Sequence, residues 1–482
     1  MLIKLCIYIL VLTIVYFLVP NKVKWCAVLA TSIVFYLSVG IQFSFAIIFT
    51  AVVTYTAGRL LMKENERRKK RLILTISFLL CFGMWMVLKV FHDFNGFVMP
   101  LGISYYTLMG TGYLVDIYHK KYPAEKNFLK YFSYLSFFLQ IIQGPVSRFD
   151  SLSKTLFTPH SFSIERLYEG ILRIAFGIIK KCIIADRLAL SANYIFANYQ
   201  NMNGIYMFLG MIFWAVELYA DFSGYMDIVN GAAYILGIEN AENFRQPFFA
   251  RSIEEFWRRW HISLGAWFRD YMFYPISISK WAQKAGKKAR SVVGTKLGRL
   301  LPSFIALFFV WSATGLWHGV SLHFLFWGLM QMVVIMSGIL LAPVYDKVHS
   351  FFRVPADAWC WKCFQMLRTF LLFAFMEIMS QAGSVTEAIS MYGKIFTSWN
   401  IAVLRNISTI FPDMLQIDRY LILGGMILIL IVDILREKKI KLSTFLMKIP
   451  MIPRYVIYIG VCYVIVLCAA RSGGGGFAYA TY

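Results

Sequence analysis

Long apolar stretches recur along most of this chain and are separated by short polar segments. Each stretch is long enough to cross a bilayer as a helix, and the pattern predicts about ten to twelve such helices. The predicted spans begin near Leu5, Val28, Phe43, Leu72, Tyr206, Phe304, Val320, Leu371, Leu421 and Val456, with a weaker candidate near Ile171. We therefore predict an all-α polytopic membrane protein with one integral-membrane domain over residues 1–482.

Composition and charge support this class. Hydrophobic residues make up 59% of the chain and charged residues 15%, against about 45–50% and about 25% in soluble domains. The net charge of +23 comes largely from basic clusters at the ends of predicted spans, in residues 63–71, 280–299 and 436–448. Such clusters are typical of the cytoplasmic ends of spans, so we expect no nucleic-acid partner. Binding of anionic membrane lipids by these clusters stays open.

Two familiar kinds of catalytic site find no support in the sequence. No GxSxG motif for a serine nucleophile occurs, and we find no metal-ligand cluster. Cys360 and Cys363 form a single CxxC pair, and a pair without a second one is weak evidence for zinc.

His318 is the first candidate for chemistry, because it lies in a segment without formal charges from Leu300 to Tyr345. A helix that begins at Leu300 rises roughly 1.5 Å per residue and would carry His318 most of the way across the hydrocarbon core. Trp311, Gly315 and His318 share one helical face at this spacing. The residues alone leave two interpretations open: a reactive histidine in a protein-lined cavity, or a histidine hydrogen-bonded to another helix for packing.

His261 is the second candidate, within the unusually charged and tryptophan-rich run from Glu254 to Tyr271. Read as one amphipathic helix, the run places Glu254, Arg258 and His261 on one face. The adjoining face collects the apolar side chains Trp257, Trp260, Leu264 and Trp267. On composition alone, the pattern favours an interfacial anchor without chemistry over a functional site.

Asp221 closes a mostly apolar run that begins at Met207. We expect it either to pair with an arginine such as Arg258 or Arg269, as a structural ion pair, or to belong to a substrate site. The arginines could instead contact phosphates of an acyl donor.

Several blocks together resemble the membrane-bound O-acyltransferase family. They are Asp221 to Tyr225, Glu242 to Phe244, Glu255 to Pro275 and Gly315 to Gly319. Pro100 to Tyr106 and Gln143 to Val146 are similar to its bacterial branch, which includes alginate O-acetylation proteins and teichoic acid D-alanyltransferases. The blocks follow the family's order within a motif-bearing core of residues 98–335.

The resemblance implies a ring of tilted transmembrane helices around a funnel, with interfacial helices, in the bacterial cytoplasmic membrane. It also implies that His318 is the catalytic histidine and His261 the second motif histidine. The pKa of an imidazole lies near neutral pH, which suits a general base, so we predict this role for His318. We predict that His261 orients the donor or stabilises an oxyanion. The predicted substrate-binding residues are Glu254, Arg258, Trp311, Trp317 and Asp221.

The same resemblance implies transfer of an acetyl group from a cytoplasmic thioester donor to an extracytoplasmic hydroxyl, for O-acetylation of a cell-surface polysaccharide. The donor would be acetyl-CoA or an acyl carrier protein, used as a cosubstrate with no bound cofactor. The implied partners are membrane lipids and either an extracytoplasmic polysaccharide-modifying acetyltransferase or the glycan itself.

Two other functions stay open from the sequence. One is D-alanyl transfer from a carrier protein to teichoic acid, and the other is a non-catalytic glycan transporter. We detect no internal repeat of the kind that transporters show. We also expect the aromatic tail Phe477 to Tyr482 to fold back on the protein or to contact a partner.

Overall fold

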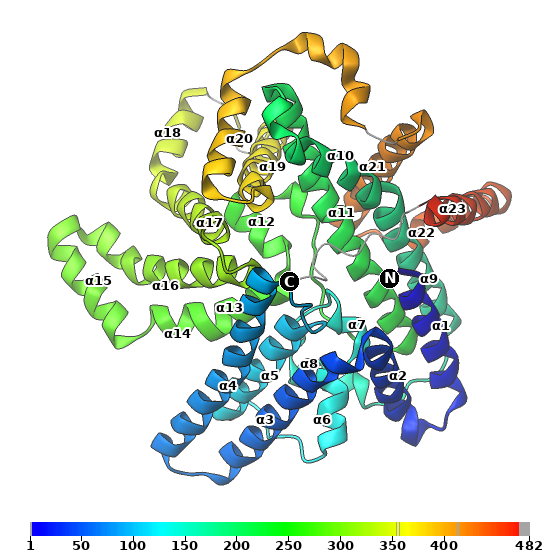
Figure 1. Cartoon of the computed structure of the whole chain (residues 1–482), viewed down its shortest axis with the longest axis vertical. Helices are drawn as coiled ribbons and strands as arrows, with labels where there is room; N and C mark the ends of the chain where they lie inside the picture. The colour runs from blue at the N-terminus through cyan, green and yellow to red at the C-terminus, as the bar shows by residue number, and fades with distance from the viewer. Residues whose placement is uncertain (1, 353, 356, 412–413, 472–482) are drawn as a thin grey trace. The chain divides into compact units, whose positions relative to one another are not determined.

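The structure is a computed structural model that describes residues 2–352, 354–355, 357–411 and 414–471 (Figure 1). The aromatic tail Phe477 to Tyr482 lies outside the described residues. Within these ranges the chain forms helices and connecting loops, and the single β-type contact is a bridge between Phe244 and Trp260. The predicted all-α class is confirmed.

Eight helices among the described residues are long and apolar enough to cross a membrane. They are α2 (Lys24–Val39), α3 (Ser44–Lys63), α4 (Arg67–Asn95), α11 (Gly204–Leu236), α16 (Thr295–His318), α17 (Leu322–Leu340), α19 (Trp359–Gln381) and α23 (Met451–Arg471). Each corresponds to a predicted span, so the chain is a multi-pass membrane protein. The predicted spans near Leu5, Ile171 and Leu421 also form helices, but these are shorter or more charged: α1 (Leu2–Leu18), α9 (Ile164–Ile179) and α21 (Gln416–Glu437).

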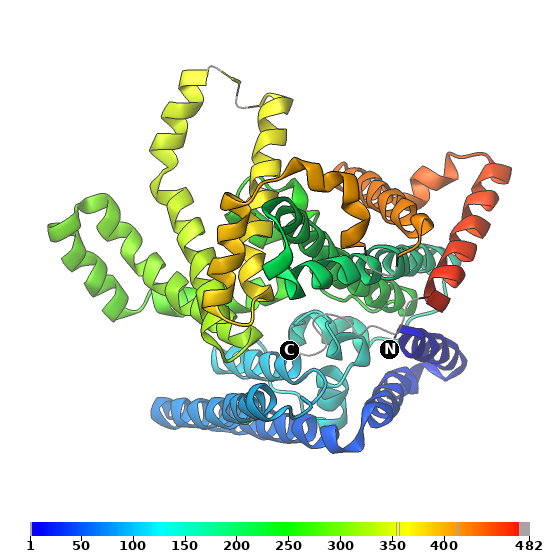
Figure 2. The ribbon, with the colours of Figure 1, turned by 45° about the horizontal axis from the view of Figure 1, so that its top comes forward.

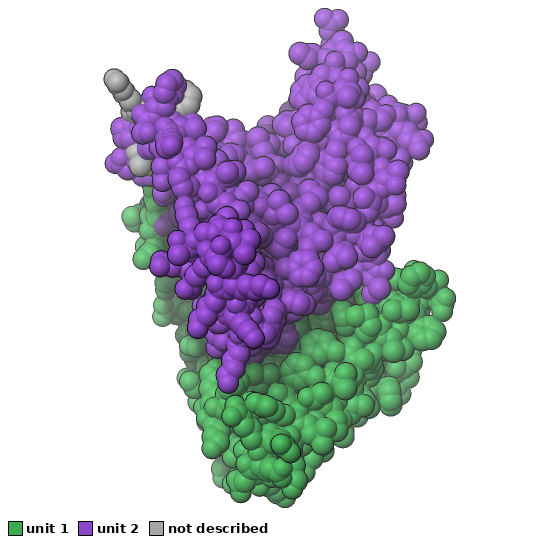
Figure 3. Space-filling model, turned by 90° about the vertical axis from the view of Figure 1, so that its left-hand side faces the viewer, with its two compact units in different colours: residues 1–183, 220–243, 438–482 green, residues 184–219, 244–437 purple. Residues whose placement is uncertain are grey.

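The chain divides into two compact units, coloured separately in Figure 3. Unit 1 contains residues 1–183, 220–243 and 438–482, and unit 2 contains residues 184–219 and 244–437. The long helix α11 contributes its first half to unit 2 and its second half to unit 1.

Unit 1 is built around α3, α4 and α5 (Ile103–Tyr118), which run side by side (Figure 2). Glycine permits the close crossing of α3 and α5, because a Cβ on Gly110 would lie 3.0 Å from the Thr54 side chain. Thr54 also accepts a hydrogen bond of 2.7 Å from the hydroxyl of Tyr131. Unit 1 also contains α1, α2, α9, α23 and the second half of α11, together with the short helices α6 (Phe128–Leu135), α7 (Phe138–Ile141), α8 (Phe149–Leu156) and α22 (Leu442–Met447).

A second close crossing in unit 1 joins α9 to α11. A Cβ on Gly177 would lie 2.5 Å from the carbonyl oxygen of Gly224, and one on Gly170 would lie 2.7 Å from that of Gly231. The backbones can therefore approach only because these residues lack side chains. Just beyond this crossing the chain widens into a π-helical turn that begins at Lys180.

The π-helical turn carries two lysines into a buried ionic cluster. Lys181 Nζ lies 2.7 Å from Asp221 Oδ1, and Lys180 Nζ lies 2.6 Å from Asp227 Oδ2. Arg173 adds a contact of 2.9 Å to Asp227. The expected structural ion pair of Asp221 thus exists, but the partner that the structure shows is a lysine rather than Arg258 or Arg269. The reason is tertiary: the glycine crossing brings α9, which is distant in sequence, against α11.

Unit 2 contains the other helices and the segment rich in tryptophan. They are α10 (Asp186–Ala197), α12 (Ile253–Arg259), α13 (Ile262–Phe268), α14 (Tyr274–Ser277), α15 (Lys280–Val293), α16, α17, α18 (Ala342–Phe352), α19, α20 (Val385–Thr397) and α21. Helix α15, which carries most of the basic cluster 280–299, packs against α16. Helices α16 and α17 approach closely because Cβ atoms on Gly315 and Gly328 would lie 2.4 Å and 2.2 Å from carbonyl oxygens of the facing helix.

We predict that the Lys181 to Asp221 pair is essential for stability. Lys181→Met leaves a fully buried carboxylate without its lysine partner, which should cost about 3–5 kcal/mol. The double variant Lys181→Met/Asp221→Asn should recover most of this loss, because no carboxylate then remains at position 221. Thermal unfolding of the purified protein in detergent measures both effects.

The exposed pair of Arg258 and Glu254 provides the control, since its atoms also lie 2.7 Å apart but its side chains are 64% and 55% exposed. Arg258→Met should cost at most about 1 kcal/mol. Asp221→Asn alone completes the set. If the double variant lost as much stability as Lys181→Met and Asp221→Asn together, the pairing would be contradicted.

Candidate functional site

The run from Glu254 to Tyr271 is not one helix. Helix α12 ends at Arg259 and α13 begins at Ile262, and His261 lies in the break with φ 45° and ψ 49°. This left-handed conformation is unfavourable for a residue other than glycine and is typical of functional sites held in place by their surroundings. The surroundings include the Phe244 to Trp260 bridge and a 2.9 Å hydrogen bond from the Arg245 amide to the Arg259 carbonyl.

The break removes the helical face that Glu254, Arg258 and His261 were predicted to share. Glu254 and Arg258 lie on the surface of unit 2 and pair with one another, Nη1 to Oε1, at 2.7 Å. His261 is only 5% exposed. The prediction of one face is wrong, because the helix that would define it ends before His261.

The apolar side chains of the same run pack inside unit 2 rather than serving only as an interfacial anchor. Trp260, Leu264 and Trp267 are buried. Trp257 is partly exposed, and its Nε1 donates a hydrogen bond of 3.2 Å to Gln331 Oε1 on α17.

His318 is the last residue of α16 and is half-buried. The following Gly319 is extended, with φ −172°, which any residue can adopt. Glycine is required at this position for space, because a Cβ would lie 2.3 Å from the Phe324 ring. The tight packing of Gly319 on Phe324 fixes the point at which the chain leaves α16.

Trp317 brings the two predicted histidines together. Its ring centroid lies 6.1 Å from that of His261 and 4.8 Å from that of His318, with edge-to-face geometry in both pairs. Trp317 itself is buried. The two motif histidines, which are far apart in sequence, therefore contact the same indole ring.

A second tryptophan, Trp327, contacts His318 and is hydrogen-bonded to a buried acid, Glu377. The ring centroids of His318 and Trp327 lie 4.8 Å apart at 73°. Trp327 Nε1 donates a hydrogen bond of 3.0 Å to Glu377 Oε1, and Ser380 Oγ donates one of 3.1 Å to Glu377 Oε2. Glu377 is 3% exposed and lies inside the candidate span α19. An acid buried in a membrane span is a functional-site candidate by its cost alone.

Trp311 extends this group of rings. Its centroid lies 5.0 Å from that of Trp257 and 6.3 Å from that of Trp327. We refer to Trp257, Trp311, Trp317 and Trp327 as the tryptophan cluster. Of the predicted site residues, Trp317 thus contacts both candidate histidines, while Trp311 contacts Trp327, which in turn contacts His318.

Burial sets the protonation of His261. Its location in the interior lowers the pKa of the imidazole to about 3. Burial favours the neutral form, because charge is poorly solvated there. At neutral pH, His261 is therefore a neutral ring with one N–H donor and one acceptor nitrogen.

Glu377 and Trp327 were not among the predicted site residues. Glu377 carries a usable signal, because it is the single acid in the otherwise uncharged run from Thr369 to Met379. Trp327 carries no such signal in the sequence, since a tryptophan in an apolar span is common. Asp221 belongs to unit 1, in the ionic cluster described above.

No group of three or more histidine, cysteine, aspartate or glutamate side chains that could hold a metal ion occurs in the part of the chain that the structure describes.

The chain is similar in sequence to several bacterial acyltransferases. The chain is 31% identical over 313 residues to a probable alginate O-acetylase of Pseudomonas syringae pv. tomato, and the matched region covers 64% of this chain and 55% of that protein. It is 28% identical over 284 residues to the teichoic acid D-alanyltransferase of Bacillus subtilis, with 56% and 65% covered. It is 25% identical over 264 residues to the peptidoglycan O-acetyltransferase of Helicobacter pylori, with 49% and 47% covered.

The chain thus spans a little over half the length of the alginate-type relative that it matches. The family match itself covers residues 118–382, which is more than half of the 482 residues and includes both histidines, the tryptophan cluster and Glu377. The chain belongs to the membrane-bound O-acyltransferase family.

Proposed function

We propose that the protein is an O-acyltransferase that moves an acetyl group from a cytoplasmic thioester donor to a hydroxyl on the outer side of the bacterial cytoplasmic membrane. The product would be an O-acetylated cell-surface polysaccharide. The observation that carries the proposal is the contact of His261 and His318 with the same ring, Trp317. The relatives named for O-acetylation of alginate and peptidoglycan support the choice of acetyl.

His318 is the general base in this proposal. The acceptor oxygen attacks the thioester carbonyl, so a C–O bond forms while the C–S bond breaks. One ring nitrogen of His318 takes the hydroxyl proton and passes it to the departing sulfur, which leaves as a thiol. The place of His318 at the end of α16, half-buried, suits a group that must meet both substrates.

His261 acts as the neutral partner. Negative charge develops on the carbonyl oxygen as the hydroxyl attacks, and a fixed N–H donor in a buried site stabilises that charge. Because the pKa of His261 is lowered to about 3, its ring stays neutral and keeps one N–H group as a hydrogen-bond donor. It carries no extra proton that could protonate the base, His318. The backbone at His261 is held in the left-handed conformation, and its ring packs against Trp317.

Glu377 and Trp327 are positioning residues in this account. Glu377 holds the Trp327 indole through its Nε1 atom, and the indole packs against the His318 ring. A catalytic group that is misplaced by about 1 Å can lose about a hundredfold in rate, so a fixed wall beside His318 has catalytic value.

Donor and partners follow from the same proposal. Acetyl-CoA is the simplest donor, and an acyl carrier protein is the alternative. The acceptor is the glycan itself or a separate extracytoplasmic acetyltransferase. D-alanyl transfer is the second candidate function, because the Bacillus subtilis relative bears that name.

The first prediction of this proposed function concerns the product. A deletion strain complemented with the wild-type gene should regain base-labile acetate on its envelope polysaccharide, measured by mild-base release and mass spectrometry. His318→Ala, at matched protein level, should lower ester formation by about 10²–10⁴-fold, the usual contribution of a general base.

Two results would overturn parts of this proposal. Recovery of D-alanine instead of acetate would replace the acetyl assignment with the second candidate. Full recovery of either ester by His318→Ala would remove His318 from the mechanism.

The second prediction concerns pH. The folded-state pKa of His261 lies near 3, below an unfolded value of about 6.5. The unfolded chain therefore binds the extra proton between these values, and stability falls as pH falls from about 6.5 toward 3, by up to about 1.4 kcal/mol per pH unit.

His261→Asn should flatten this slope in thermal unfolding measured between pH 7 and pH 4.5. His119→Asn, at an exposed histidine, is the matched control and should keep the slope. An unchanged slope in His261→Asn would mean that the His261 ring is not held neutral by burial.

A further inference from the structure

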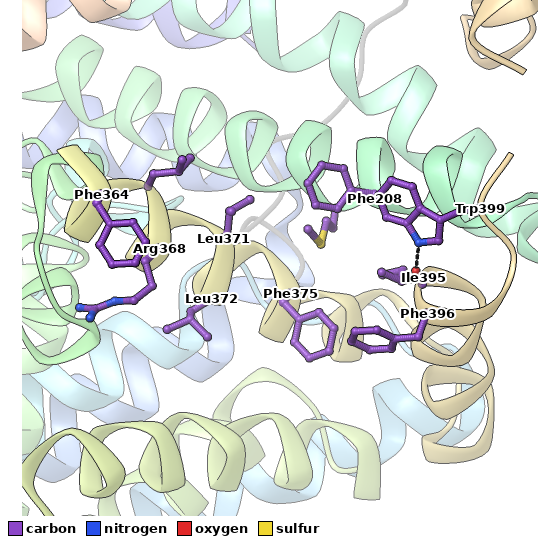
Figure 4. A pocket seen from close by; sticks show the side chains of 11 residues that line it. Phe208, Phe364, Arg368, Leu371, Leu372, Phe375, Ile395, Phe396 and Trp399 are labelled. Carbon is purple, nitrogen blue, oxygen red and sulfur yellow. Dashed lines mark hydrogen bonds between the residues drawn. The ribbon is translucent and has the colours of Figure 1, made fainter. Parts of the chain in front are cut away.

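An apolar cavity of about 640 Å³ runs along α19 in unit 2. It lies between α19, the first part of α11 and the end of α20, and its walls include Phe208, Phe375 and Phe396 (Figure 4). It is separate from the histidine site, since neither His261, His318 nor any member of the tryptophan cluster lines it.

The cavity has the length of one membrane leaflet. Its lining on α19 begins at Phe364 and ends at Phe375, and eleven helical steps span about 16 Å at roughly 1.5 Å each. This is close to half of the about 30 Å hydrocarbon thickness of a bilayer. Because α19 is long and apolar enough to cross a membrane, a cavity along it is placed to meet lipid acyl chains.

The two ends of the cavity differ in polarity. Figure 4 shows Arg368 toward one end and Trp399 at the other. Arg368 is the single charged side chain of the lining, and its Nη2 donates a hydrogen bond of 2.7 Å to the carbonyl oxygen of Arg251. The Trp399 indole is held by a hydrogen bond to the carbonyl oxygen of Ile395.

In the described part of the chain, Arg368 makes no ion pair at its end of the cavity, although the Glu255 carboxylate accepts a hydrogen bond of 2.9 Å from the neighbouring Arg251 amide. Among the described residues, no carboxylate forms an ion pair with the side chain of Arg368 or with that of Arg251. A ligand that suits this cavity therefore has a long apolar part, no polar groups along that part, and negative charge at one end.

We propose that this cavity binds one acyl chain of an anionic phospholipid, with the head-group phosphate on Arg368. The bilayer supplies this ligand directly, and basic side chains at the membrane surface attract anionic lipids. An arginine fork also matches phosphate geometry. This inference does not depend on the proposed acyl transfer.

Native mass spectrometry of the full-length protein in detergent tests the inference. After delipidation, dioleoyl phosphatidylglycerol and dioleoyl phosphatidylcholine are titrated separately, since they share acyl chains and differ in net charge. We expect the wild type to retain a first phosphatidylglycerol at lower concentration than a first phosphatidylcholine. Arg368→Gln should weaken the first phosphatidylglycerol about fivefold, the equivalent of one basic contact at the membrane surface.

Three further variants separate the site from general effects. Arg368→Lys keeps the charge and should retain most of the preference. Leu371→Trp fills the cavity and should remove the tightly bound first lipid of either kind. Arg290→Gln removes a charge from the basic helix α15 and should change nothing at this site.

The inference is overturned if the wild type retains both lipids equally. It is also overturned if Arg368→Gln weakens the first phosphatidylglycerol no more than Arg290→Gln does, or if Leu371→Trp leaves the first lipid in place. Because the measurement reads lipid binding alone, loss of acyl transfer in any variant does not affect its outcome.

Discussion

The hydrogen bond between Trp327 Nε1 and Glu377 is the contact on which the proposed site depends. An acid inside a membrane-spanning helix costs free energy unless it is paired, so α19 can carry Glu377 only where a donor meets it. Trp327 on α17 is that donor at 3.0 Å, and Ser380 supplies a second at 3.1 Å. The bond fixes α17 against α19, and it fixes the indole that His318 contacts.

Close helix crossings make this arrangement possible. Gly315 and Gly328 let α16 and α17 touch backbone to backbone, so that His318 at the end of α16 reaches Trp327. In unit 1, Gly177 and Gly224 do the same for α9 and α11. The second crossing carries no part of the histidine site, but it shows the same principle: small residues at the contact set which polar groups can meet.

Much of the fold could be predicted from the sequence, because membrane spans are determined by local composition. The eight long apolar helices were all predicted. The face shared by Trp311 and His318 also follows from helical spacing alone, and both residues contact Trp327.

What could not be predicted depends on contacts between distant segments. The break at His261 has no proline or glycine beside it, and the amphipathic period continues through it, so the sequence favours an unbroken helix. The tertiary contacts of Trp260 override that preference. The pairing of Asp221 with Lys181 requires the crossing of α9 and α11, and the bond from Trp327 to Glu377 joins residues 50 positions apart.

The most direct test of this account is a double-mutant cycle on Trp327 and Glu377, measured as the rate of ester formation at matched protein level. Trp327→Phe removes the donor and Glu377→Leu removes the acceptor, while Glu377→Gln keeps an acceptor and serves as the conservative control. The account predicts that each of the first two variants slows transfer and that the double variant is no slower than the slower single variant. It also predicts that Glu377→Gln retains most of the rate. If the losses of the two single variants multiplied in the double variant, the two residues would act independently, and the proposed support of His318 would be wrong.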